Sequence, residues 1–311
     1  MANLKHIIWE GFKTGLTISV NILLFMIPIS FAITVLQFYD IIDKLAVPFT
    51  PLFKHLGLSG ETVIVYFTGV LVNCYSAIAI MITMPLTLKE ITILAAILLI
   101  AHNMPIESMI QKKAGANALL ITIIRLGMSI FLGYILNLII PESGEILHRN
   151  FSPEATLSLS GTLLLWLSTN SILILKILVI INVLTVLNRI LDHYGIIRTI
   201  SGLFKPLMAL FGISSETTVV WLAANLFGLV YGSGIILSQD KEKLSPYDLN
   251  KLHISIGISH SLVQETLIFV VIGAPLFWVT IPRIISAIVA VWIFILVKQL
   301  RFKTAQPELN N

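Results

Sequence analysis

The sequence predicts an all-α, polytopic integral membrane protein built from two copies of one unit. The chain has 311 residues, of which 57% are hydrophobic and only 12% are charged, and its mean hydropathy is +0.95. That composition leaves too much apolar surface for a soluble domain. Several windows run without a charge for more than about 20 residues, the length that a helix needs to cross about 30 Å of hydrocarbon. These windows cover residues 14–39, 62–88, 155–175 and 217–239.

The first window follows a short basic flank and therefore imitates a secretory signal peptide. It is too long for one and lacks a clear cleavage site of small residues, so we interpret it as a retained first span. The single cysteine, Cys74, excludes a disulfide within the chain. The net charge of +4 comes from scattered basic residues, which favours cytoplasmic loops over nucleic-acid binding. The sequence has no GxxxxGK[ST] or HExxH motif, and we expect neither an enzyme nor a cofactor.

Two parts of the chain match each other at a nearly constant offset. PLFKHLGLSGETVIV at 51–65 matches PLMALFGISSETTVV at 206–220, and LQFYDII at 36–42 matches LDHYGII at 191–197. Polar residues also align further on, where His102, Glu107, Gly115, Ala116, Thr122 and Arg125 match His260, Glu265, Gly273, Ala274, Thr280 and Arg283. We therefore predict a first repeat at 12–140, an extracytoplasmic linker at 141–164 and a second repeat at 165–300.

Each repeat reads as one long span, a short amphipathic piece, an interrupted apolar stretch and two further spans. The interrupted stretch is either a full span or a re-entrant hairpin, and the distribution of charge discriminates between the two. With hairpins and a cytoplasmic N-terminus, twelve of the sixteen basic residues outside the spans fall inside, and four fall outside, namely Lys44, Lys54, Lys89 and Arg149. Full crossings give nine inside and seven outside. The positive-inside tendency therefore favours hairpins.

Three true spans per repeat, an odd number, place the second repeat upside down relative to the first. Inverted repeats whose broken elements meet near the bilayer midplane are typical of secondary transporters. We expect the hairpin tips at 72–77 and 228–234, where small residues allow the chain to turn. Gly228 and Gly232 alternatively serve close helix packing, since they form a GxxxG spacing. The protein is expected in the bacterial inner (plasma) membrane, with both termini cytoplasmic.

Polar side chains inside the apolar stretches mark the candidate site. Lipid would penalise each by roughly a few kcal/mol, so they should face a cavity or one another. Pro105 is expected to break the helix near His102 and to free backbone carbonyls, whereas the second repeat lacks such a proline and is expected to hold a straighter helix. The candidate substrate-binding residues are Asn73, Tyr75, Ser76, His102, Asn103, Asn225, Tyr231, Ser233, His260, Ser261 and Gln264.

Glu107 and Glu265 are candidates for ion coupling or proton relay. Coupling to H⁺ would use these carboxylates, and coupling to Na⁺ would use the freed carbonyls. In the alternative interpretation, both glutamates lie near helix ends and are neutralised by water or by Arg125 and Arg283.

At the twice-occurring pattern P-L-x-x-x-x-G-[LI]-S-x-E-T, followed by an interrupted apolar stretch, the chain resembles the Gate family of membrane domains, also called nucleoside recognition domains. The resemblance covers each predicted repeat once. It extends to concentrative nucleoside transporters, to spore-maturation membrane proteins and to the membrane part of ferrous-iron permeases. It implies a secondary transporter of a small polar solute, nucleoside-like by the family name. The partners implied are that solute and the bilayer, with a homo-oligomer possible and no nucleic acid.

Two alternative functions follow from the same resemblance. Residues 57–81 are similar to the gate segment of ferrous-iron permeases, which implies a divalent-metal permease with Cys74, His102 and Met104 as soft or borderline ligands. A pair of Gate units also resembles the spore-maturation membrane proteins, which implies a membrane scaffold or accessory protein that does not transport.

Overall fold

The computed structural model describes residues 4–142, 158–238 and 244–305, and every regular element in these ranges is a helix. Six helical segments in them are long and apolar enough to cross a membrane. They are α1 (Leu4–Phe38), α6 with α7 (Leu88–Lys113), α8 (Ala118–Ile139), α9 (Leu159–His193), α13 with α14 (Pro246–Val271) and α15 (Leu276–Ala305). The predicted all-α architecture with several membrane-spanning helices is confirmed.

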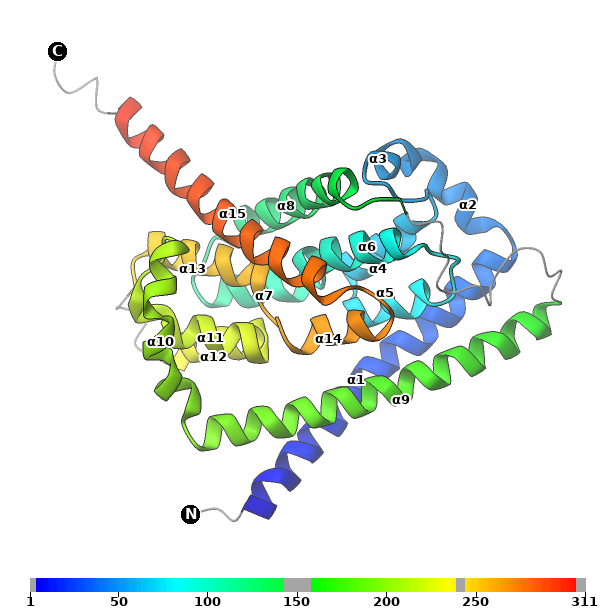
Figure 1. Cartoon of the computed structure of the whole chain (residues 1–311), viewed down its shortest axis with the longest axis horizontal. Helices are drawn as coiled ribbons and strands as arrows, with labels where there is room; N and C mark the ends of the chain where they lie inside the picture. Colours follow the sequence, from blue (N-terminus) through cyan, green and yellow to red (C-terminus); the bar gives the residue numbers. More distant parts are fainter. Residues whose placement is uncertain (1–3, 143–157, 239–243, 306–311) are drawn as a thin grey trace.

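The long helices α1 and α9 cross each other along one side of the molecule (Figure 1). Small residues of α1 make their close contact possible. A Cβ atom at Gly15 would lie 2.7 Å from Asn182 Oδ1, and one at Gly11 would lie 2.9 Å from Val186 Cα. The crossing is also held by polar contacts, because Trp166 Nε1 donates to Ser30 Oγ at 3.0 Å.

The predicted amphipathic pieces follow these long helices. In the first half this piece is divided into α2 (Ile41–Ala46), a 3-10 turn (Val47–Phe49) and α3 (Thr50–His55). Prolines explain the division, since Pro48 and Pro51 each stand at the start of a new element. In the second half the piece is one helix, α10 (Ile196–Leu210), which keeps Pro206 inside.

Both interrupted apolar stretches fold as helical hairpins. The first consists of α4 (Thr62–Leu71) and α5 (Cys74–Met81), and the second of α11 (Thr218–Phe227) and α12 (Leu229–Ser238). Ten residues of helix are only about 15 Å long, so none of these helices crosses a membrane alone. Within each hairpin the helices pack closely, because a Cβ at Gly69 would lie 3.3 Å from Ala77 Cβ and one at Gly232 only 2.5 Å from Ala224 Cβ.

The two glycines of the GxxxG spacing have different roles. Gly228 turns the chain between α11 and α12 with φ +96° and ψ 164°, a backbone conformation that favours glycine. Gly232 instead permits the close approach of α12 to α11. The hairpin interpretation and the packing interpretation therefore both hold, each for one glycine.

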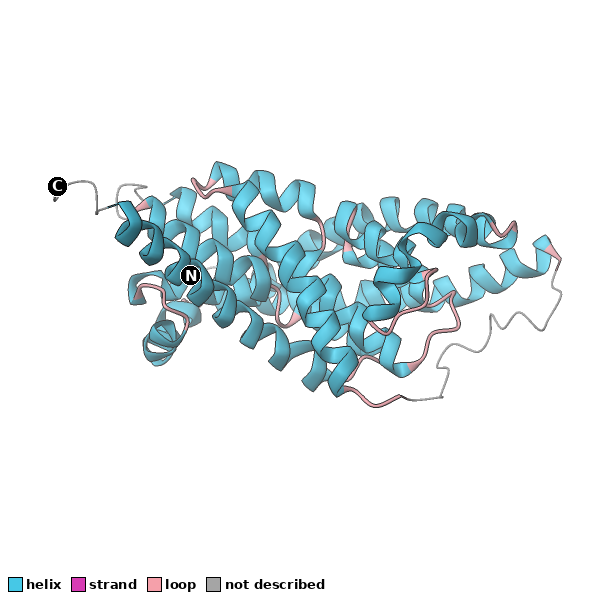
Figure 2. Cartoon of the chain, turned by 90° about the horizontal axis from the view of Figure 1, so that it is seen from above, coloured by secondary structure: helices cyan, strands magenta, loops and turns pink. Residues whose placement is uncertain are grey.

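The hairpins join the rest of the molecule at opposite ends. In Figure 1, α4 and α5 are connected to their neighbours on the right, and α11 and α12 on the left, where the start of α1 and the end of α15 also lie. Seen from above, the helices form one elongated bundle (Figure 2). Which end faces the cytoplasm stays a prediction.

Burial separates central helices from lipid-facing ones. In α6 nearly every residue is buried, as expected for a helix that is apolar all round and lies inside a bundle. The large exposed apolar side chains lie mainly on α1, α8, α9 and α15. These outer faces suit contact with lipid tails, and the polar residues described next lie inside.

Candidate functional site

Two membrane-spanning segments break at matching histidines. Helix α6 (Leu88–Ala101) ends before His102, Asn103 adopts a left-handed conformation with φ 51°, and α7 (Met104–Lys113) follows. Helix α13 (Pro246–Ser259) ends before His260, Ser261 has φ 53°, and α14 (Gln264–Val271) follows. The prediction of a straighter second helix is therefore wrong.

Proline does not cause the breaks. Pro105 lies in the first turn of α7, where a missing N–H costs nothing. The hairpins stabilise the broken backbone instead. At the first break, Asn103 N donates to Gly69 O at 2.9 Å. At the second, Ser261 N donates to Ala224 O at 3.1 Å and Leu262 N donates to Asn225 O at 2.8 Å. Backbone donors that leave their helices are thereby satisfied by the ends of α4 and α11.

Arg125 of α8 donates to two carbonyls at the first break. Its Nε donates to Ile100 O at 2.8 Å and its Nη2 to His102 O at 3.2 Å. The prediction that carbonyls freed at this break are available to Na⁺ is therefore wrong for Ile100 and His102, whose oxygens accept from a buried guanidinium.

Around the breaks, two histidines and two glutamates form a buried charged centre. His102 Nε2 lies 3.0 Å from Glu265 Oε2 and 3.3 Å from Glu107 Oε1. His260 Nε2 lies 3.2 Å from the same Glu107 oxygen. The two imidazole rings have their centroids 5.0 Å apart. Each half of the chain therefore supplies one histidine and one glutamate, and contacts cross between the halves.

The arginines that match in sequence differ in their contacts. Arg125 Nη1 pairs with Glu107 Oε2 at 2.6 Å, which agrees with the interpretation that an arginine neutralises this glutamate. Arg283 of α15 is also fully buried, yet it donates from Nη2 to Thr266 Oγ1 at 3.2 Å and its Nε and Nη1 have no hydrogen-bond partner. Glu265 is paired with His102 instead.

The remaining predicted residues lie at varying distances from this centre. The Tyr75 hydroxyl accepts from Gln264 Nε2 at 3.2 Å, and Gln264 precedes Glu265 in the first turn of α14. Asn73 caps α5 by accepting from Ser76 N at 2.8 Å, and the Ser76 hydroxyl is buried without a hydrogen-bond partner. Asn225 donates to Trp221 O at 2.8 Å, which leaves its Oδ1 unpaired.

Asn103 Oδ1 and Ser233 Oγ are two further polar atoms at the breaks and hairpins that have no hydrogen-bond partner. Tyr231 lies elsewhere and is 38% exposed. It lines a separate pocket of about 690 Å³ together with Asp192, His193 and Arg198, between α9, α10 and the second hairpin. The structure therefore does not bring Tyr231 into the charged centre.

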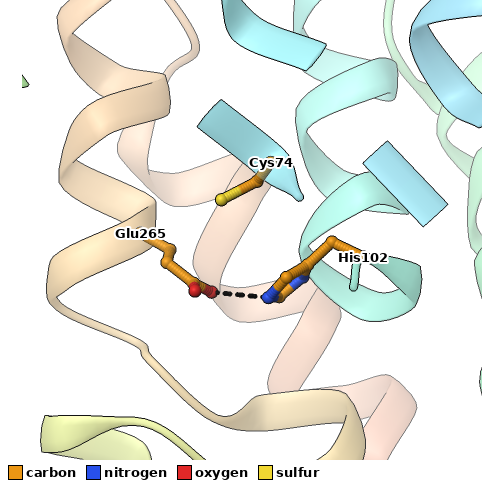
Figure 3. Close-up of side chains that lie close together, drawn as sticks. All are labelled: Cys74, His102 and Glu265. Carbon is orange, nitrogen blue, oxygen red and sulfur yellow. Dashed lines mark ion pairs between the residues drawn. The ribbon is translucent and has the colours of Figure 1, made fainter. Parts of the chain in front are cut away.

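Cys74 at the start of α5 lies beside the charged centre. Figure 3 shows its sulfur directed toward the pair formed by His102 and Glu265, and the ligand atoms of these three residues lie within 4.8 Å of one another. Met104, the third predicted metal ligand, is buried at the start of α7. The sequence predicts the Met104 thioether as a ligand together with Cys74 and His102. In the structure the residue grouped with Cys74 and His102 is Glu265.

Sequence reasoning missed Gln111. Its amide is fully buried in α7 with no hydrogen-bond partner on either atom, and a Cβ at Gly257 would lie 3.0 Å from its Nε2. The available signal is its spacing, four residues after Glu107, which places both on one face of a helix.

No family model matches the chain, and no solved structure matches it. Among curated proteins, an uncharacterized membrane protein of Bacillus subtilis (strain 168), YvoD, is 27% identical over 292 residues. The match covers 92% of this chain and 93% of that protein. This chain is a membrane protein. Both its six apolar helical segments and the likeness over nearly its whole length support that conclusion.

Proposed function

We propose that this protein is a secondary transporter of a small polar solute. The observation that carries the proposal is the buried centre of His102, His260, Glu107 and Glu265, which both broken helices supply. Ionisable side chains at membrane depth are costly and mark solute or ion pathways. Broken helices and hairpins around them are the usual construction of transporter sites.

In this proposal the solute binds between the hairpins and the two breaks. Polar atoms that have no hydrogen-bond partner are available there, among them Ser76 Oγ, Asn103 Oδ1 and Asn225 Oδ1. A buried polar atom without a partner is unfavourable by about 1–3 kcal/mol, and a bound solute would satisfy it. Glu107 and Glu265 would couple transport to H⁺. The protein would lie in the plasma membrane with both termini cytoplasmic.

A two-stage experiment tests the proposal. First, thermal unfolding of the purified chain is measured with nucleosides, nucleobases, amino acids and small carboxylates at high concentration. A ligand at about 100 times its dissociation constant should add about 2.7 kcal/mol to the free energy of unfolding. Second, uptake of the stabilising compound is measured in liposomes that contain the wild type or Asn225→Ala.

We expect one chemical class to stabilise the protein and to enter the liposomes, and Asn225→Ala to reduce both effects. Asn225→Ala is suitable because one of its two amide atoms is already unpaired. If no compound is taken up and the protein instead purifies with a stoichiometric partner chain, the transporter proposal is wrong and a scaffold role replaces it.

A further inference from the structure

We propose that His102, His260 and Glu107 bind one divalent transition-metal ion of the Zn²⁺, Fe²⁺ or Mn²⁺ class. The inference rests on the proposed function only in using the same site, because metal binding is measured without transport. His102 and Glu107 come from the first half of the chain and His260 from the second, and this set differs from the cysteine, histidine and methionine set that the sequence resemblance implied.

The tautomer of both histidines favours metal binding. His102 Nδ1 lies 3.0 Å from Leu98 O, and His260 Nδ1 lies 2.9 Å from Ile256 O. A carbonyl oxygen only accepts, so each Nδ1 carries the hydrogen and a neutral ring has its lone pair on Nε2. Metal-binding histidines are oriented in this way, with the second nitrogen donating to a backbone carbonyl.

Each Nε2 lone pair faces carboxylate oxygens, which are also acceptors. The three separations between these atoms are 3.0, 3.2 and 3.3 Å. Such acceptors repel each other unless a proton or a metal cation lies between them, and the experiment below discriminates between these two. In a tetrahedral zinc site with bonds of about 2.0–2.2 Å, neighbouring ligand atoms are about 3.3–3.6 Å apart. The separations of 3.2 and 3.3 Å between Glu107 Oε1 and the two histidines are close to this range.

The neighbouring arginine supports this arrangement. Arg125 pairs with Glu107 through Oε2 and leaves Oε1 facing both histidines. It thereby fixes the orientation of the carboxylate, as the hydrogen-bonding neighbours of metal ligands do. The ligand atoms of His102, Glu107 and His260 lie within 4.8 Å of one another, whereas Glu265 contacts His102 and belongs to a second group with Cys74.

The ligand types select the class of metal. Two imidazoles with a carboxylate suit zinc, iron or manganese, whereas Ca²⁺ and Mg²⁺ prefer sites made of oxygen alone. The sulfur of Cys74 approaches only the His102 and Glu265 side of the centre. We therefore assign the metal to nitrogen and oxygen ligands without the thiol.

The test uses the purified full-length chain after treatment with EDTA. Zn²⁺ binding is measured by calorimetry, and the visible spectrum of added Co²⁺ reports the ligands. We expect one metal ion per chain and a Co²⁺ spectrum without a thiolate charge-transfer band. His102→Gln and His260→Gln should each weaken Zn²⁺ binding at least tenfold. The wild-type spectrum needs no variant, so failure of a variant to fold leaves the inference testable.

His253→Gln provides the matched control. This histidine is also fully buried in α13, but neither ring nitrogen has a hydrogen-bond partner and it belongs to neither metal-binding group. Its substitution should leave Zn²⁺ affinity unchanged. Absence of stoichiometric Zn²⁺ binding would overturn the inference and would indicate protons between the acceptors. A thiolate band that Cys74→Ser removes would also overturn it.

The outcome for metal binding is separate from that for transport. Zn²⁺ binding without uptake of any organic solute supports this inference and contradicts the proposed solute transport. Uptake of an organic solute by a chain that binds no metal supports the proposed solute transport and contradicts this inference.

Discussion

Arg125 and Arg283 are matched in sequence and equally buried, but only Arg125 has all its nitrogens in contact with acceptors. Arg125 satisfies two freed carbonyls and one carboxylate. Arg283 has a single hydroxyl partner among the described residues. Their contributions to stability should therefore differ, although both are arginines without solvent contact.

We predict that Arg125→Gln lowers the free energy of unfolding by about 3–5 kcal/mol, the usual effect of removing one partner from a buried ion pair. Arg283→Gln should lower it much less, because two of its nitrogens make no hydrogen bond that could be lost. Thermal unfolding of both variants in one detergent measures the difference. Equal losses would show that Arg283 has a structural role comparable with that of Arg125.

The sequence was sufficient to identify the four titratable residues of the centre but not their pairing. His102, His260, Glu107 and Glu265 are evident as polar residues in apolar surroundings. The contact between His260 and Glu107 joins residues 153 positions apart, and such a contact depends on how the helices pack. The role of Asn73 as the N-cap of α5 was missed for a related reason. A cap can be recognised only when the first residue of the helix, here Cys74, is known.

At the scale of elements, hairpins and broken helices depend on each other. The ends of α4 and α11 accept the backbone donors that leave α6 and α13. Sequence reasoning found the first break because Pro105 marks it, and missed the second, where backbone contacts with the hairpin take the place of any local signal. Both hairpins were predictable from the sequence. If the two apolar stretches were full spans, the basic residues would be divided almost evenly between the two sides of the membrane, against the positive-inside tendency.

We predict that Gly228→Ala destabilises the protein by about 1–3 kcal/mol, because alanine adopts a φ of +96° only with strain. A Cβ there would also lie 3.1 Å from Ser261 Oγ and press on the second break. Gly202→Ala in α10 is the control, since no atom lies within 4 Å of its added Cβ. It should be neutral or stabilising by up to about 1 kcal/mol. Similar unfolding temperatures for both variants would contradict the assigned role of Gly228.

At the scale of the whole molecule, the two hairpins are attached at opposite ends of the bundle (Figure 1). The inverted arrangement that the sequence predicts requires this placement. The inward orientation of the polar residues in the apolar stretches was inferable from the cost of exposing them to lipid. The crossing of α1 and α9 was not, since it depends on small residues such as Gly15 fitting against a particular partner.

We predict that a reporter fused after Met84 lies outside the cell, whereas one in the short turn at 114–117 lies inside with the N-terminus. These positions follow from a hairpin between Thr62 and Met81 and a crossing from Leu88 to Lys113. Enzymatic reporters active on one side of the membrane measure them. A cytoplasmic reporter after Met84 would make the hairpin a full crossing and would exclude the inverted arrangement.

The burial of Cys74 gives the protein an intrinsic probe of conformation. It is the single cysteine of the chain, it is fully buried, and it lies next to the charged centre. A thiol reagent added from one side of a sealed vesicle can modify the native protein only when the centre opens to that side. The rate of alkylation, compared between reagent added inside and outside, would therefore measure alternating access without any engineered label.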